Sequence, residues 1–294
     1  PYDTLEDIIK GKNIDSLLDN DIKFDCLPLN KGKFDVKKIK NYIKKHSPKM
    51  IYIQRSRGYE WREAISINEI EKIVKTIKEL GFDGCIMLDN CYGEFLDKRE
   101  GTDVGVNLMA GSMIKNLGGG ITPTGGYIVG DKKYIEMIER RMTAPSIAGE
   151  VGSYAFGYQY YYQGIFMAPH IVLQSVKGAM LFSAVLSKLG YDTMPKPFKL
   201  PNDIITSIKF NDKEKLISFI QTIQHNSPID SYVTAEPSQM PGYSDEVIMA
   251  AGCFVQGASI ELSADAPIRP PYIAYLQGGL TYEHCKIALK NMNL

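Results

Sequence analysis

The sequence predicts an α/β protein with a mostly parallel sheet, followed by a smaller α+β unit. Three observations lead to this fold class. In the first half, short apolar runs alternate with helical patterns, as in parallel sheets built with right-handed crossovers. A long helical stretch with few breaking residues follows, over about residues 170–189. The remainder, about residues 195–294, mixes short strand-like and helical segments.

The first half supplies the elements of the predicted parallel sheet. The clearest helical pattern repeats isoleucine and valine on one face with lysines on the other, and Gly81 closes it. Two apolar runs of strand length lie on either side of that helix. In chain order, we predict a helix over 37–45, a strand over 50–54, a helix over 67–80, a strand over 84–89 and a strand over 126–130.

A change of composition after the long helix predicts a domain boundary near residue 190. The turn Met194-Pro-Lys-Pro197 marks this change. We therefore expect a large domain over 1–190, which includes the long interdomain helix, and a small C-terminal domain over 191–294. Within the small domain we predict strands over 204–210 and 253–262, and helices over 213–223 and 282–292.

Composition excludes several classes of function. Lys and Arg number 34, and Asp and Glu also number 34, so no basic field favours nucleic acid or a membrane surface. We find no signal peptide and no uninterrupted apolar run of about 18 residues. The five cysteines form no CxxC pair, which indicates reduced thiols and a cytoplasmic protein. The four histidines are scattered, so no metal site is predicted. A small-molecule enzyme remains the favoured class.

Ligands of parallel sheets bind at the carboxyl ends of the strands; two segments meet that condition, and a third, which precedes a glycine run, is a further candidate. They are residues 54–59, 89–94 and 110–115. Asp89 ends an apolar strand, where it would serve either as a turn or cap residue or as a carboxylate that binds a cation or a protonated ring nitrogen. In the segment 54–59 the polar side chains receive no assigned role.

Lys115 is the only ionisable residue between Val104 and Gly126. Such a lysine either extends to solvent or, among small apolar residues, becomes an amine suited to imine chemistry. Ser112 precedes it by three residues, either as a simple turn serine or as a donor to phosphate. The glycines 118–120 would provide flexible slack or let the backbone pass close to a flat ligand.

Three motifs together resemble a known family. They are the run 89–95 (DNCYGEF), the run 111–120 (GSMIKNLGGG) and the run 277–281 (QGGLT). The combination is similar to fold-type-I pyridoxal-5′-phosphate (PLP) enzymes, and within them to the methionine γ-lyase-like, cystathionine β-lyase-related family, often labelled aluminium-resistance protein. The resemblance extends from Pro1 to Leu294. It implies an aspartate-aminotransferase-like PLP-dependent transferase fold.

The resemblance also implies roles for four residues. Lys115 would form the imine with PLP and later move the substrate α-proton. Asp89 would pair with the pyridinium nitrogen and keep the ring an electron sink. Ser112 would contact the phosphate. Arg269 would bind the substrate α-carboxylate, since its planar guanidinium matches that group; the alternative is an ordinary surface arginine.

Members of this family carry a further stretch before the position that matches Pro1. This stretch supplies a phosphate-binding loop and part of the oligomer contact. Because the chain begins with Pro1 and enters a helical pattern at Tyr2, we expect the large domain to be incomplete at its N-terminus. We expect a homo-oligomer, a dimer or tetramer, and assign the tyrosine-rich run 158–163 to packing or a subunit interface rather than to base stacking.

The predicted function is a PLP-dependent carbon–sulfur lyase acting on a sulfur-containing amino acid such as methionine or cystathionine. An aminotransferase uses the same residues and remains open, because fold does not fix reaction. A non-catalytic PLP-fold remnant that binds a partner is the third possibility.

Overall fold

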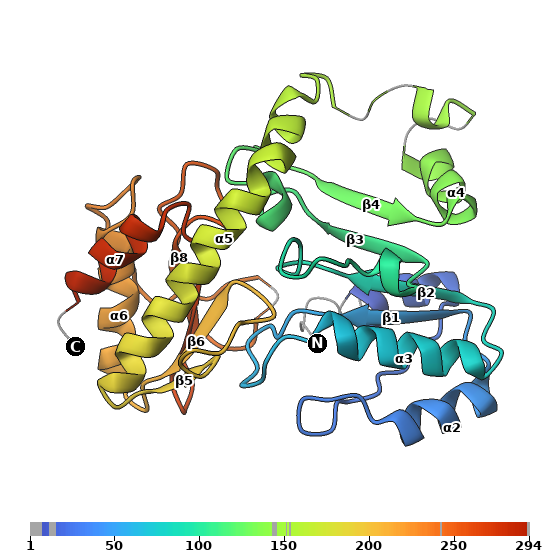
Figure 1. The fold of residues 1–294 in the computed structure, drawn as a ribbon, viewed down its shortest axis with the longest axis horizontal. Helices are drawn as coiled ribbons and strands as arrows, with labels where there is room; N and C mark the ends of the chain where they lie inside the picture. Colours follow the sequence, from blue (N-terminus) through green and yellow to red (C-terminus); the bar gives the residue numbers. More distant parts are fainter. Residues whose placement is uncertain are drawn as a thin grey trace.

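A computed structural model describes residues 8–11, 16–142, 146–150, 152, 154–241 and 243–292. Two sheets lie on either side of one long helix, α5 (Gln159–Lys188) (Figure 1). Strands and helices alternate in the first half, which confirms the α/β class. The helix expected at the start of the chain falls largely on residues 1–7, outside the described residues. The domain boundary expected near residue 190 stays a prediction.

The first sheet has the strand order β1-β2-β3-β4. Three of its strands are parallel, and β4 is antiparallel to β3. The sequence analysis missed β3, which contains a methionine and three small residues in place of a β-branched run. The strands are β1 (Met50–Gln54), β2 (Cys85–Asp89), β3 (Leu108–Ser112) and β4 (Gly126–Gly130).

One face of this sheet is covered by α3 (Ile67–Glu79). Ser66 and Glu69 form a capping box at its N-terminus, and its buried isoleucines pack against Ile86 and Leu88 of β2. Because side chains alternate along a strand, Asp89 of β2 points to the opposite face. The other helical segments of this half are η1 (Leu17–Asn20), α2 (Val36–His46), η2 (Thr102–Val104), η3 (Asn116–Gly118), α4 (Lys132–Met142) and η4 (Ala148–Glu150).

The second sheet is antiparallel throughout, with the order β5-β6-β9-β8-β7. The strand predicted over 253–262 is wrong: this segment forms turns around Gly257, whose φ of +75° no regular strand adopts, and strands flank it on both sides. The elements are β5 (Asp192–Met194), β6 (Ile205–Lys209), α6 (Lys213–His225), β7 (Val247–Ala250), β8 (Ser263–Pro267), β9 (Ile273–Gln277) and α7 (Tyr282–Lys290).

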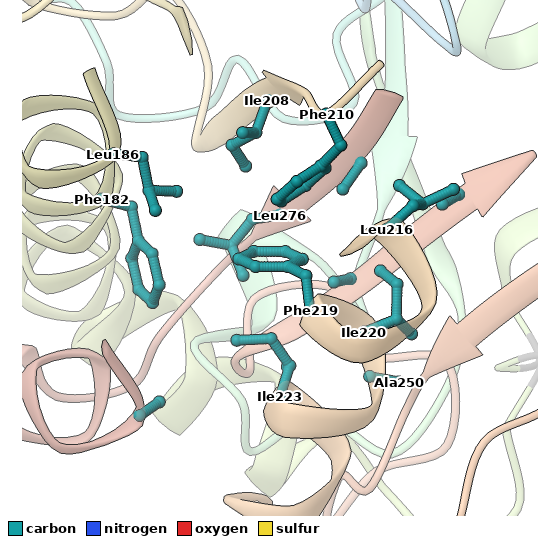
Figure 2. Close-up of a cluster of buried hydrophobic side chains, with 14 of the residues drawn as sticks. Phe182, Leu186, Ile208, Phe210, Leu216, Phe219, Ile220, Ile223, Ala250 and Leu276 are labelled. Atoms are coloured by element: carbon teal, nitrogen blue, oxygen red, sulfur yellow. The ribbon is translucent and has the colours of Figure 1, made fainter. Parts of the chain in front are cut away.

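A hydrophobic core fills the space between this sheet, α5 and α6 (Figure 2). Phe182 of α5 and Phe219 of α6 lie on either side of Leu276 of β9. Alternate residues of β9 point the other way, so Tyr275 and Gln277 face the first half of the chain. This alternation places polar side chains of the second sheet toward the candidate site.

The helix α5 begins eleven residues earlier than the sequence pattern indicated and contains Pro169. By length and composition alone this helix could cross a membrane. The search of the sequence for an uninterrupted apolar run did not detect it. Its small buried residues pack against η3, and its C-terminal half packs against the second sheet. Tyr162 and Phe166 remain exposed on its N-terminal half.

The two halves are joined by a buried ion pair. Arg57, just after β1, donates two hydrogen bonds to the carboxylate of Asp203, with Nη2 to Oδ1 at 2.7 Å and Nε to Oδ2 at 2.9 Å. Both side chains are almost fully buried. The Tyr275 hydroxyl also donates to the backbone carbonyl of Tyr59. These contacts fix the second sheet against the carboxyl ends of the parallel strands.

Candidate active site

Asp89 lies at the carboxyl end of β2 with its carboxylate held by two donors. The Tyr52 hydroxyl donates to Oδ2 at 3.0 Å, and the backbone N–H of Cys91 donates to Oδ1 at 3.0 Å. Burial and the nearby Asp89 charge both raise the pKa of Tyr52, so the phenol stays a neutral donor. The arrangement stabilises an anionic carboxylate at the sheet edge. Tyr52, which the sequence analysis did not single out, is therefore part of the site.

Ser112 and Asp89 emerge from the same face of the sheet. Asp89 pairs with Ala110 in the parallel register of β2 and β3, and Ser112 follows Ala110 by two positions. The Ser112 hydroxyl oxygen accepts a hydrogen bond from the backbone N–H of Ile114 at 3.3 Å. This turn leads the chain out of β3 and into the segment that carries Lys115.

Lys115 directly precedes η3 and points its amine over an aromatic ring. Its Nζ lies 5.1 Å from the centroid of Tyr92, a cation–π distance. In the described part of the chain, Lys115 forms no ion pair within 4.0 Å. Both Lys115 and Asp89 act electrostatically on the thiol of Cys91, which places amine and carboxylate around one site.

The glycine run after Lys115 is explained by chain packing. A Cβ on Gly118 would lie 1.7 Å from the carbonyl oxygen of Met113, and a Cβ on Gly119 would lie 2.8 Å from the carbonyl oxygen of Gly164 in α5. These glycines allow the lysine loop to fold back on itself and α5 to approach it. The two sequence-based interpretations, flexible slack and close passage of a flat ligand, are not needed to account for Gly118 and Gly119.

A buried polar network lies behind the strand ends and was missed by the sequence analysis. Glu94, which is 2% exposed, accepts a hydrogen bond from the Tyr127 hydroxyl at 2.8 Å, while its Oε2 has no partner in the described structure. Burial raises the pKa of Glu94 to about 8. Beside it, Arg55 donates to Asn90 Oδ1 at 2.7 Å. The only available sequence signal was the position of Glu94 and Asn90 inside the motif 89–95.

A cleft opens between the end of β1 and the second sheet. Its volume is about 270 Å³, and Gln54, the register neighbour of Asp89, contributes to its wall. Arg269 also lines it, half-exposed, with Nη1 2.8 Å from Oδ2 of Asp245. The remaining lining residues are Arg57, Gly58, Tyr59, Glu60, Arg62, Tyr243, Ser244, Val247 and Pro267. The structure thus places Arg269 at a cleft, already paired with one carboxylate.

A second carboxylate, Asp265 of β8, faces the same region from the second sheet. Gln277 donates to its Oδ2 at 3.2 Å. Burial raises the pKa of Asp265 to about 6, and the positive charge of Lys115 opposes that rise. Sequence analysis could not connect Asp265 with Lys115, because 150 positions separate them and their electrostatic interaction depends on how the sheets meet.

The fold of the chain is shared with a PLP-dependent protein of low sequence identity. It superposes on the pyridoxal-5′-phosphate dependent protein YhfS of Escherichia coli with a TM-score of 0.53 at 12% identity, over 88% of this chain and 66% of that chain. This likeness shows the fold alone and supports the aspartate-aminotransferase-like architecture expected from the motifs.

The methionine gamma-lyase family profile matches residues 1–293, and the chain belongs to that family. It is 50% identical to a carbon–sulfur lyase involved in aluminum resistance from Clostridium novyi NT, with a TM-score of 0.92 over 98% of this chain and 68% of that one. It is 50% identical to the protein YnbB of Bacillus subtilis over 98% of this chain and 69% of that protein. A 33.9 kDa protein from the glnA 5′ region of Lactobacillus delbrueckii subsp. bulgaricus is 45% identical over 99% of this chain and 96% of that protein.

Proposed function

We propose that this protein is a PLP-dependent carbon–sulfur lyase that acts on a sulfur-containing amino acid, with Lys115 as the lysine that binds the cofactor. The observation that carries the proposal is the arrangement of one amine and one anionic carboxylate at adjacent strand ends. Lys115 has no ion-pair partner within 4.0 Å in the described structure, and Asp89 is held by Tyr52 and by the Cys91 N–H.

The residues present fit PLP by their chemistry. PLP carries a carbonyl carbon that an amine attacks, a ring nitrogen that a carboxylate keeps protonated, and a phosphate that hydroxyl and N–H groups bind. Asp89 and Ser112, on one face of the sheet, and Lys115, in the loop that follows β3, would provide these three partners. When bound, PLP supplies the electron sink that stabilises negative charge on the substrate α-carbon.

The chain's own residues perform the remaining tasks. Lys115 accepts the α-proton at Nζ and returns it to the leaving portion of the substrate. Tyr52 stays a neutral donor and fixes the position of the Asp89 carboxylate through its hydrogen bond to Oδ2. Arg269, on the cleft wall, binds the α-carboxylate with the edge of its guanidinium that Asp245 does not occupy, because Asp245 contacts only Nη1.

Two observations favour elimination over the alternatives. The Clostridium novyi relative, at 50% identity, is described as a carbon–sulfur lyase, and the family profile is that of methionine gamma-lyase. The amine, carboxylate and hydroxyl are all present, which argues against a non-catalytic remnant. Methionine and cystathionine are the substrates we expect, and the homo-oligomer remains part of the proposal.

Borohydride reduction in the presence of PLP, followed by peptide mapping, tests the cofactor assignment. We expect the label on Lys115, and no label in Lys115→Ala; a label on another lysine would refute the assignment. The reaction is tested by incubation with cystathionine, cysteine and methionine without added keto acid. Sustained release of keto acid and ammonia, together with hydrogen sulfide from cysteine or methanethiol from methionine, supports a lyase. A single turnover that resumes only when keto acid is added indicates an aminotransferase.

A further inference from the structure

Asp265 is a carboxylate in a position that the proposed lyase reaction does not explain. It lies on β8, on the face of the second sheet that is turned away from the hydrophobic core and toward the first half of the chain. Gln277 is its one hydrogen-bond partner among the described residues, through Oδ2. A partly buried carboxylate is costly unless nearby groups compensate its charge, and one neutral amide compensates only in part.

The lysine loop lies against the turn segment that connects β7 and β8. Ile114 Cδ1 lies 3.4 Å from the position that a Cβ on Gly257 would occupy. The ring beneath the Lys115 amine, Tyr92, donates its hydroxyl to Ser259 Oγ at 3.1 Å. Tyr92 also packs in a cluster with Tyr275, which pairs with Asp265 in the register of β8 and β9. Asp265 therefore faces the site where the amine lies.

The neighbouring carboxylate, Asp89, is less available to the amine. Both of its oxygens already accept hydrogen bonds, from the Tyr52 hydroxyl and the Cys91 N–H. Among the described residues, Oδ1 of Asp265 has no hydrogen-bond partner, and it is not one of the buried oxygens that lack a partner, so solvent reaches it. A free, solvent-reached oxygen is the better acceptor for a mobile ammonium group.

We propose that Asp265 is a positioning residue for Lys115: its carboxylate is the counter-charge that the lysine ammonium faces, and it controls how readily that amine reacts. This inference rests on the proposed function, in which Lys115 is the reactive amine. It assigns the second sheet a role in the chemistry of the lysine, through a residue 150 positions further along the chain.

The charges around Asp265 support the same role. Burial raises its pKa to about 6, and Lys115 is the one charged group that counteracts this rise. Burial, with a smaller contribution from the Asp265 charge, raises the pKa values of Tyr92 and Cys253, so both remain protonated and neutral beside Asp265. With neutral Gln277 completing the surroundings, Lys115 is the cation that Asp265 acts on. Below about pH 6 the Asp265 carboxyl takes up a proton, and the neutral group no longer attracts the Lys115 ammonium.

The test is the reactivity of Lys115 toward a limiting dose of acetic anhydride at pH 8, measured on the full chain by mass spectrometry relative to the exposed lysines of α2. Asp265→Asn keeps the shape and removes the charge. We expect Lys115 to react about three to ten times faster in this variant, since a nearby opposite charge favours the protonated amine. Asp265→Glu should restore slow labelling. Asp192→Asn, which removes an exposed carboxylate on β5, should change nothing.

Two outcomes separate the inference from the proposed function. If Lys115 traps PLP on borohydride reduction but labels equally fast in wild type and Asp265→Asn, the inference is overturned and the function stands. If Lys115 does not trap PLP, the function fails regardless of labelling. Circular dichroism checks the fold of each variant, and Asp265→Ser, smaller and also neutral, gives the same comparison should the amide variant not fold.

Discussion

Glu94→Gln gives the sharpest physical test of the buried network behind the site. Glu94 is 2% exposed, and burial raises its pKa from 4.5 to about 8. In the folded protein it therefore keeps its proton at pH values where the unfolded chain has released it. A carboxyl of this kind lowers stability as pH rises between those two values, because unfolding allows it to ionise. Glutamine has nearly the same shape and does not titrate.

The expected magnitude follows from the folded and unfolded pKa values of this carboxyl. A tenfold change in its proton affinity corresponds to about 1.4 kcal/mol, so this one group costs the wild type about 4–5 kcal/mol between pH 4.5 and pH 8. The free energy of unfolding of Glu94→Gln minus that of the wild type should thus become more positive by about 1.4 kcal/mol per pH unit across this window. The side-chain carbonyl oxygen of the introduced glutamine can still accept the hydrogen bond from the Tyr127 hydroxyl.

Urea denaturation of both proteins at half-unit steps from pH 5 to 8 measures this difference. Subtracting the two curves cancels the titration of the groups that do not interact with Glu94. Glu79→Gln, at the exposed end of α3, is the matched control and should give a difference that does not change with pH. A flat difference for Glu94→Gln, or one that falls with pH, would refute the assignment of a buried, protonated Glu94.

Three further substitutions test the site and its support. Asp89→Ala should reduce kcat/KM by the equivalent of about 3–5 kcal/mol, the usual loss for a buried charged partner, and near-normal turnover would show that another carboxylate serves the ring. Asp203→Ala should destabilise the fold by about 3–5 kcal/mol in urea because it leaves Arg57 buried and unpaired, whereas a loss under about 1 kcal/mol would contradict this. Gly118→Ala should cost about 1–3 kcal/mol, since its Cβ would overlap the carbonyl oxygen of Met113; unchanged stability would show that the loop adapts freely.

The secondary structure was largely accessible from sequence because it depends on local patterns. The isoleucine spacing of α3 and the apolar runs of β1 and β2 are each sufficient to specify an element. The pattern failed where side chains carry a weak signal. The strand β3 was missed because it contains glycine and serine, which are uncommon in strands. Residues 253–262 were predicted as a strand because they are partly apolar, but their buried apolar side chains belong to turns.

Asp89, Ser112 and Lys115 were identifiable because strand-end position and local charge are properties of one stretch of chain. The residues that contact these three could not be identified from the sequence. Tyr52 reaches Asp89 only through the register of β1 and β2, and Tyr92 reaches Lys115 only because its hydroxyl and ring are fixed against the second sheet.

The sequence by itself thus determined the α/β class, the order of the chemically important residues and the family to which the chain belongs. Tertiary structure alone decided that Glu94 is buried, that Arg57 pairs with Asp203 and that Asp265 faces Lys115. The physical reason is the range of the interactions. Helix periodicity and strand alternation act over a few residues, whereas burial and charge pairing depend on which distant surfaces the folded chain brings together.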